Sequence, residues 1–225
     1  MQQRTTGSIR SYDKRVLLER LLTLSPDETP ADTVFPLLHE PDYHIRLLAA
    51  KVLARCKHPA LFSHVMKQLP DADSKTKVVL IDILRELGNP AAALQLWDCL
   101  LNSNADVRFA SALAFAVLGE EAMRFALEQW SRCDRESRVK VIRAFSRLPQ
   151  GGEELFERAL TDDDFWIRQE TVKALSSRKN PATTRLLIKI SEDSFPLVRE
   201  EALRECYTRN AKSGSDGLIK GDVYG

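Results

Sequence analysis

The stretch DDDFWIRQETVKAL, residues 162–175, decides the fold, because its spacing recurs along most of the chain. It joins a short polar turn, a basic residue at Arg168 and the apolar positions of a helix. Self-similarity at a fixed period of 20–50 residues indicates a repeat protein. Equivalent basic residues stand at intervals of 30 or 31 residues: Arg15, Arg46, Lys77, Arg108, Arg138, Arg168 and Arg199.

Polar residues keep the same register before each basic residue. Their short side chains suit a tight turn and accept hydrogen bonds from the free N–H groups at a helix start. The turn before each basic residue is therefore predicted to cap a helix. These residues are, four positions before it, Asp42, Asp73, Asn104, Asp134 and Asp164, and six positions before it, Glu40, Asp71, Asn102, Asp162 and Asp193.

Apolar residues three, four and seven positions after the basic residue form the stripe of an amphipathic helix. Examples are Ala49, Ala50, Leu53; Leu80, Ile81, Leu84; Val141, Ile142, Phe145; Ala202, Leu203 and Cys206. An earlier helix fills the rest of each repeat. Its start is marked by Pro, Gly or Asn residues at 58–59, 89–90, 119–120, 151–152 and 180–181. No useful stretch alternates like a strand. The sequence predicts an all-α solenoid of about seven stacked helix pairs.

The motif Asp-x-Asp/Asn-x-x-Val/Ile-Arg, followed by spaced Ala and Leu, resembles HEAT repeats, and more narrowly their short phycobilisome-lyase-type variety. The resemblance covers residues 11–209 and is specific for fold but not for function. Lys14 and Glu19 make the first repeat atypical, as in a capping repeat. Residues 1–10 are expected to form an N-terminal arm, and 210–225, rich in Gly and Ser, a flexible tail.

Composition narrows the function. The 33 basic and 32 acidic residues leave a net charge of +1, which argues against a dedicated nucleic-acid binder. No segment has the roughly 18 apolar residues that span a bilayer, and the N-terminus lacks a secretory pattern. Cys56, Cys99, Cys133 and Cys206 form no C-x-x-C pair and are expected to be buried free thiols. We expect a cytoplasmic, bacterial protein without membrane insertion.

In HEAT repeats the second helix of each pair lines the concave face, so the resemblance implies that residues one, two, five and nine positions after the basic residue face solvent there. These positions favour two basic patches flanking an apolar strip of Val79, Phe109, Leu113 and Val117. Such a groove suits an acidic or amphipathic protein segment. The predicted contact residues are Arg20, Lys51, Arg55, Leu113, Lys140, Arg143, Arg147, Lys173 and Arg204.

Three other features have competing interpretations. The recurring Arg is expected to pair with turn carboxylates rather than bind a ligand. Phe165 and Trp166 replace polar turn residues and either contact a partner or pack onto Phe195. The histidines, His39, His44, His58 and His64, do not form an H-E-x-x-H pattern, so no metal site is predicted.

Enzyme alternatives follow from the resemblance alone. Deoxyhypusine hydroxylases need four His-Glu pairs, and only His39-Glu40 is present. HEAT-like alkylpurine DNA glycosylases use concave-face tryptophans, whereas Trp97 and Trp130 fall on the first helices of their pairs and Trp166 on a turn. An accessory subunit in bilin attachment to chromophore proteins is a further alternative. No nucleophile–base pair is apparent, so we predict no catalytic residues, no cofactor and a protein-binding scaffold.

Overall fold

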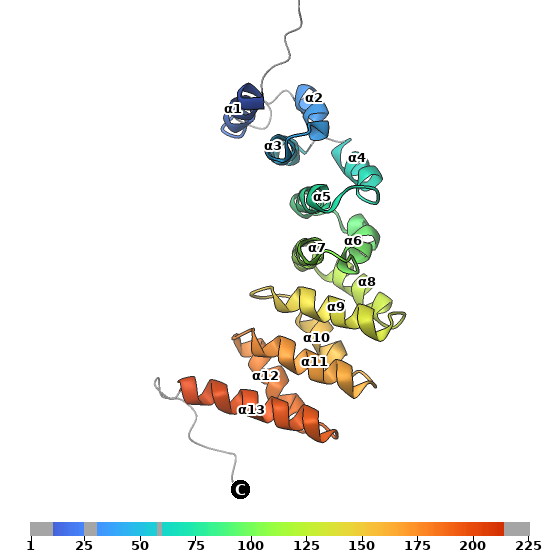
Figure 1. The fold of residues 1–225 in the computed structure, drawn as a ribbon, viewed down its shortest axis with the longest axis vertical. Helices are drawn as coiled ribbons and strands as arrows, with labels where there is room; N and C mark the ends of the chain where they lie inside the picture. The colour runs from blue at the N-terminus through green and yellow to red at the C-terminus, as the bar shows by residue number, and fades with distance from the viewer. Residues whose placement is uncertain (1–10, 25–30, 58–59, 214–225) are drawn as a thin grey trace, which may run out of the picture.

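The computed structural model describes residues 11–24, 31–57 and 60–213, and every regular element in them is helical (Figure 1). Two rows of helices run along the stack. The inner row comprises α1 Ser11–Leu21, α3 Tyr43–Arg55, α5 Ser74–Leu87, α7 Ala105–Leu118, α9 Arg135–Ser146, α11 Phe165–Ser176 and α13 Pro196–Ser213. The outer row comprises α2 Ala31–Val34 with the 3-10 helix η2 Phe35–His39, α4 Leu61–Gln68, the 3-10 helix η3 Pro90–Ala92 with α6 Ala93–Leu100, α8 Glu120–Trp130, α10 Glu153–Leu160 and α12 Pro181–Ile190.

The all-α solenoid predicted from the repeat is confirmed. Each inner helix carries one of the recurring basic residues, and within the described ranges α1 is followed by six outer–inner pairs. Helix α13 continues to Ser213, past the boundary expected at residue 209. The expected arm at 1–10, the helix start at 58–59 and residues 214–225 lie outside the described residues.

The predicted N-caps set where the inner helices begin. Asp42 accepts a hydrogen bond from the His44 N–H at 2.8 Å, and Asp73 accepts from the N–H groups of Lys75 and Thr76 at 2.9 and 3.1 Å. Asn104, Asp134 and Asp164 cap α7, α9 and α11 in the same way. Because a cap satisfies an otherwise unpaired N–H, it fixes the helix start and with it the register of the apolar stripe.

The core runs between the two rows. The residue four positions after the basic residue is at most 1% exposed in every inner helix from α3 to α11: Ala50, Ile81, Ala112, Ile142 and Val172. Each of these helices packs against the inner helix of the next repeat. In α13 the equivalent Leu203 is 39% exposed, because among the described residues no helix packs on that side.

The recurring arginine stabilises the turn in front of its helix. Nη1 of Arg108 donates to the carbonyl oxygens of Asn102 and Ser103 at 2.8 and 2.7 Å. Arg46, Arg168 and Arg199 make the same pair of contacts. These bonds satisfy backbone oxygens of the turn. The pairing with carboxylates that the sequence predicts is made by Arg138 with Asp162 and by Arg168 with Asp193 of the next repeat.

The inner row lies on the inside of a curve, with α1 and α13 displaced to the left of α5 and α7 in Figure 1. The inner helices change direction between α7 and α9: α1 to α7 are seen nearly end-on, and α9 to α13 lengthwise (Figure 1). The concave face therefore twists at the middle of the stack. None of the helices in the described part combines the length and apolar character that crossing a membrane requires.

Candidate functional site on the concave face

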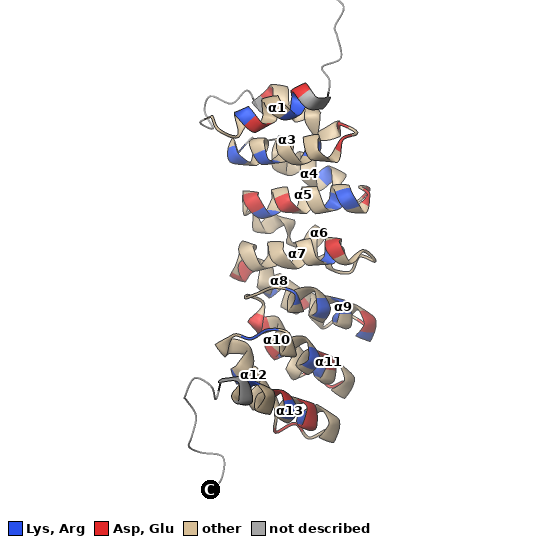
Figure 2. Cartoon of the chain, turned by 60° about the vertical axis from the view of Figure 1, so that its left-hand side comes forward, with Lys and Arg blue, Asp and Glu red and all other residues tan. Residues whose placement is uncertain are grey.

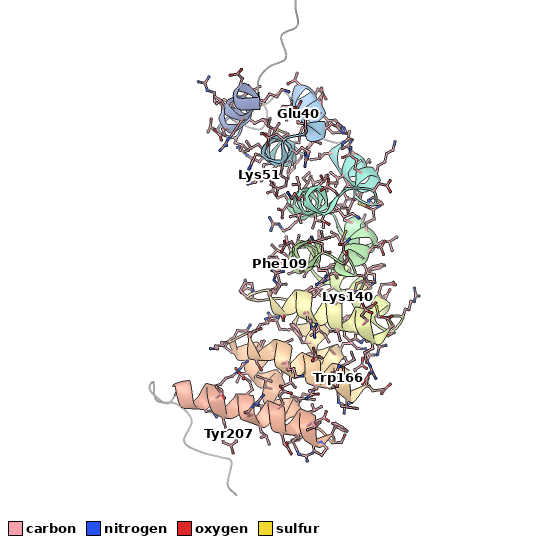
Figure 3. The ribbon with its side chains drawn as sticks, viewed as in Figure 1. Glu40, Lys51, Phe109, Lys140, Trp166 and Tyr207 are labelled. Atoms are coloured by element: carbon pink, nitrogen blue, oxygen red, sulfur yellow. The ribbon has the colours of Figure 1, made fainter. Side chains whose placement is uncertain are left out.

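The cations predicted for the concave face lie on its surface. Arg20, Lys51, Arg143, Lys173 and Arg204, five positions after the repeat's basic residue, are all exposed. Figure 2 marks Lys and Arg positions in blue along the inner helices, and Figure 3 shows Lys51 and Phe109 on the inner side of α3 and α7. The register of the repeat thus coincides with exposed positions on the inner helices.

Carboxylates accompany these cations on the last three repeats. Glu170 on α11 lies 2.8 Å from Arg143 Nη2 and 3.1 Å from Lys173 Nζ. Burial alone would raise the pKa of Glu170, but the hydrogen bonds from Arg143 and Lys173 hold it below its usual value. Arg204 pairs with Glu201 at 3.4 Å, within α13. The surface expected to be basic is therefore mixed in charge.

Lys140 is also paired, and it is half-buried. Its Nζ lies 2.8 Å from a carboxylate oxygen of Glu136, one turn earlier on α9. Figure 3 shows Lys140 on α9 and Trp166 on α11, on the part of the surface beyond the twist.

Arg55 and Arg147 fasten neighbouring inner helices to each other. Arg55 donates to the carbonyl oxygens of Leu22 and Leu24, just after the end of α1. Arg147 donates to the carbonyl oxygen of Ala105 at 3.2 Å, and its guanidinium carbon lies 4.3 Å from the centroid of the Phe109 ring. Both guanidinium groups already contact the protein, so their first role is packing.

An apolar strip occupies the centre of the face. Phe109 and Leu113 of α7 are partly buried, and Val117, one turn further, is 56% exposed. Figure 2 shows α7 largely without charge between the charged helices α5 and α9. Val79 on α5 was expected in this strip, but it is only 2% exposed and belongs to the core. We define the α7 strip as Phe109, Leu113 and Val117.

Phe165 and Trp166 differ in environment. The Phe165 ring stacks on Phe195 of the next repeat, with centroids 3.9 Å apart and planes inclined by 24°. Trp166 is 45% exposed, and Lys173 Nζ lies 5.5 Å from its ring. Leu197, 53% exposed, has the equivalent position on α13. Sequence reasoning missed Leu197, although it also stands two positions before the repeat's arginine.

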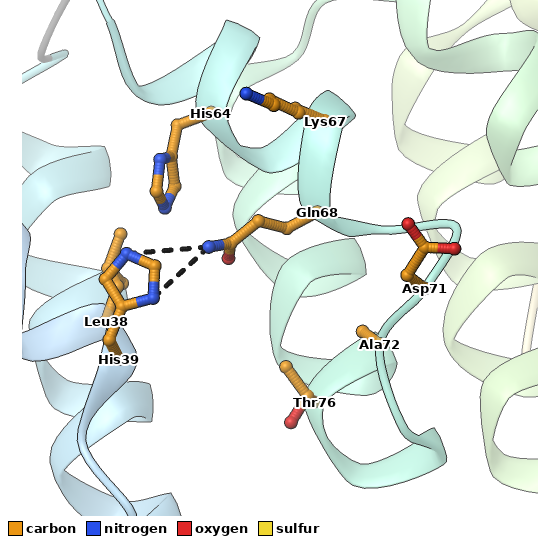
Figure 4. Close-up of a pocket in the computed structure, with 8 residues that line it drawn as sticks. All are labelled: Leu38, His39, His64, Lys67, Gln68, Asp71, Ala72 and Thr76. Atoms are coloured by element: carbon orange, nitrogen blue, oxygen red, sulfur yellow. Dashed lines mark hydrogen bonds between the residues drawn. The ribbon is translucent and has the colours of Figure 1, made fainter.

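A recess of about 560 Å³ lies away from the α7 strip, between η2 and α4 (Figure 4). The rings of His39 and His64 meet edge to face at 5.2 Å, and Gln68 Nε2 lies 3.3 Å from His39 Nδ1. The buried His64 Nε2 has no hydrogen-bond partner among the residues that the structure describes. In the described part of the chain no three His, Cys, Asp or Glu side chains gather as metal ligands would.

The tryptophans are not gathered on the concave face. Trp97 and Trp130, on α6 and α8, are 5% and 0% exposed. Trp130 Nε1 donates to Asp162 of the next repeat at 3.1 Å, and Asp162 also accepts from Arg138. These contacts give Trp130 a role in joining repeats.

Comparisons with known proteins agree with the helical architecture. A family model described as HEAT repeats matches residues 31–116 and 123–206, which together make up more than half of the 225 residues. The two matches meet close to the twist between α7 and α9. The narrower phycobilisome-lyase-type variety stays an expectation. Among curated proteins, none matches the chain.

Solved structures resemble the chain only distantly. Two engineered proteins are 17% and 18% identical to it, with TM-scores of 0.39. The alignments cover 91% of this chain and 93% and 95% of theirs. Human deoxyhypusine hydroxylase, in a complex with glycerol, is 18% identical with a TM-score of 0.38, over 91% of this chain and 82% of the enzyme. At this level the likenesses carry no functional argument.

Proposed function

Because the chain belongs to the family of HEAT-repeat proteins, we propose that it is a protein-binding scaffold whose concave face holds an amphipathic helical segment of a partner. The observation that carries this proposal is the α7 strip. On the described inner helices, the position five residues after the basic residue is charged everywhere except at Leu113. A partly exposed apolar ridge bounded by charge is the surface onto which an amphipathic helix docks.

The charges around the strip favour a partner with both signs over a purely acidic one. Arg143 and Lys173 share Glu170, so an acidic segment would compete with a carboxylate that is already in place. On the other side of the strip, α5 presents Asp82 and Arg85, which pair at 3.2 Å. A partner helix with an apolar stripe and mixed charged flanks matches this arrangement.

The proposal is tested with helical peptides displayed on phage and selected against the full chain. Leu113→Glu places a charge in the strip, and we expect the selected peptides to bind at least about tenfold more weakly, as at an interface hot spot. Leu94→Glu is the matched control, because Leu94 is 59% exposed on the outer helix α6. Circular dichroism checks that both variants keep their helices.

Two results would contradict the scaffold proposal. Selected peptides that bind the Leu113→Glu variant as well as the parent protein would show that the α7 strip is not their site. Equal weakening by Leu94→Glu would show that the change acts through charge or stability rather than through the concave surface.

A further inference from the structure

A recess of about 220 Å³ opens on the concave face between α3 and α5. Its floor is apolar and belongs to the core: Ala50, Val79 and Ile83 are at most 2% exposed. Leu47 of α3 also lines it. The volume is below the roughly 300–1,000 Å³ of typical small-molecule sites, so the recess suits one large side chain rather than a whole metabolite.

The recess exists because the Ala50 side chain is small and because, among the described residues, no side-chain hydrogen bond spans the mouth of the recess. At later junctions side chains cross between inner helices: Arg147 reaches α7, Arg143 reaches Glu170, and Gln169 donates to Glu201 at 3.0 Å. Between α3 and α5, the side-chain hydrogen bond that crosses within the described residues joins Arg46 to Thr76, near the starts of the two helices. The middle of this groove therefore stays open.

The mouth of the recess carries charge. Lys51 on the α3 side is exposed and forms no ion pair within the described part of the chain. On the α5 side, Arg85 pairs with Asp82 of its own helix at 3.2 Å, and Glu86 is exposed. The available cation is thus the Lys51 ammonium, which would attract a carboxylate beside whatever side chain enters the recess.

The recess and the α7 strip lie within reach of one helix. Packed helices are about 8–10 Å apart, so the groove between α3 and α5 is roughly 12–15 Å from the ridge of α7. Residues seven and eleven positions apart in a helix are separated by about 10 and 16 Å along its axis. A helix crossing the inner row can therefore place one apolar residue in the recess and another on Leu113.

We propose that the recess between α3 and α5 receives a large apolar side chain of the partner segment, and that a carboxylate of the same segment pairs with Lys51. The inference rests on the proposed scaffold function and specifies the chemistry of its partner. Anchoring one bulky side chain in a desolvated pocket is how a few residues dominate the affinity of an interface.

The experiment uses the helical peptides selected by display against the full chain. Ala50→Met fills the recess from within, and we expect it to weaken binding at least tenfold. Lys51→Glu at the mouth is expected to weaken binding several-fold, and replacing the peptide's carboxylate by Lys is expected to restore it. Arg124→Glu, an equal charge change on the exposed side of the outer helix α8, is the control and should leave binding unchanged.

The outcomes separate this inference from the scaffold proposal. If Leu113→Glu weakens binding but Ala50→Met and Lys51→Glu do not, the scaffold stands and the recess is not its anchor site. If none of the three changes matters, the scaffold proposal itself fails. If Ala50→Met unfolds the chain, judged by circular dichroism, the Lys51→Glu charge exchange alone decides: failure of the exchanged peptide to recover affinity overturns the inference.

Discussion

Asp193 holds the guanidinium of Arg168, from the preceding repeat, with both of its carboxylate oxygens. Arg168 Nε donates to Asp193 Oδ2 at 2.7 Å and Nη2 donates to Oδ1 at 3.0 Å. The side chains are only 13% and 6% exposed. Burial alone would raise the pKa of Asp193, but the Arg168 hydrogen bonds and the Phe195 N–H hold it below its usual value. A bidentate contact of this kind fixes the relative orientation of the two side chains and also strengthens their interaction.

Asp193→Asn should therefore lower the free energy of unfolding by about 1.5–3 kcal/mol, because it removes a charge-assisted pair and leaves the Arg168 charge partly buried. Urea denaturation measures the change. Asp163→Asn, at an exposed turn position, is the control and should stay within about 0.5 kcal/mol of the parent protein. An equal effect of the two changes would show that the Arg168 contact is not a main link between repeats.

The inner helices and their caps could be predicted because they depend on local chemistry. Asp73 or Asn104 caps the helix that starts directly after it, and the buried stripe follows at fixed offsets. The predicted burial is wrong at Leu203, because burial at this position requires a following repeat and does not depend on α13 alone. Figure 3 shows Tyr207, 65% exposed, on this same helix.

The site was predictable only in part, because its chemistry depends on contacts between repeats. The offset of five residues located Arg143 and Lys173 on the surface, but not Glu170 between them. The reach of Arg147 to α7 depends on how the helices turn at the twist. The recess beside Ala50 is space that the side chains of α3 and α5 leave unfilled, and no residue pattern in the sequence indicates it.

Gly152 should be among the least replaceable residues. Its φ is +75°, and a Cβ would overlap Cδ1 of the buried Phe145 ring and lie 2.9 Å from Cε1. Gly152→Ala is expected to cost about 3 kcal/mol or more, from backbone strain and overpacking together. Gly88→Ala, at φ +63° with no atom within 4 Å of the added Cβ, should cost only the strain, about 1–2 kcal/mol. Similar thermal shifts for the two variants would refute the overlap with Phe145.

His64 should make the protein less stable in mild acid. Burial lowers its pKa below the ordinary 6.5, and the neighbouring His39 and Lys67 lower it further. Well above pH 6.5 this ring is neutral in both the folded and the unfolded chain, so it contributes no pH dependence there. As the pH falls below 6.5, the unfolded chain binds the proton more readily, and stability decreases until the folded pKa is passed.

The measurement is the melting temperature at pH 7.5 and pH 5. His64→Phe keeps a ring against Phe35 and His39 but cannot titrate, so its melting temperature should fall less between the two pH values. His44→Gln, at an exposed position at the start of α3, is the control and should follow the parent protein. An NMR titration midpoint of the His64 ring at or above 6.5 would rule out this explanation.

Changing Arg143, Lys173 and Arg204 to Glu tests how much their ion pairs with Glu170 and Glu201 stabilise the fold. The helical content should be unchanged, but Glu170, whose side chain is 11% exposed, would then face two new carboxylates. We expect the free energy of unfolding to fall by about 1–2 kcal/mol, less at high salt, where surface charges are screened. The corresponding Gln variants remove the pairs without repulsion and are the control. A triple Glu variant as stable as the parent in low salt would mean that these pairs contribute nothing measurable.

Cys99 should be the least reactive of the four free thiols, because it alone among them is buried, whereas the sequence predicted burial for all four. Burial raises its pKa to about 11, and the residue is 5% exposed, so at pH 8 only about one thiol in a thousand is ionised. Because the thiolate is the form that attacks iodoacetamide, mass spectrometry should find Cys99 unmodified under conditions that alkylate the partly exposed Cys56. Unfolding in guanidinium removes the protection and should make the two rates equal. Alkylation of Cys99 at the rate of Cys56 in the native protein would instead reveal that the α6–α7 pair opens readily, since a thiol in this core is reached only when the helices separate.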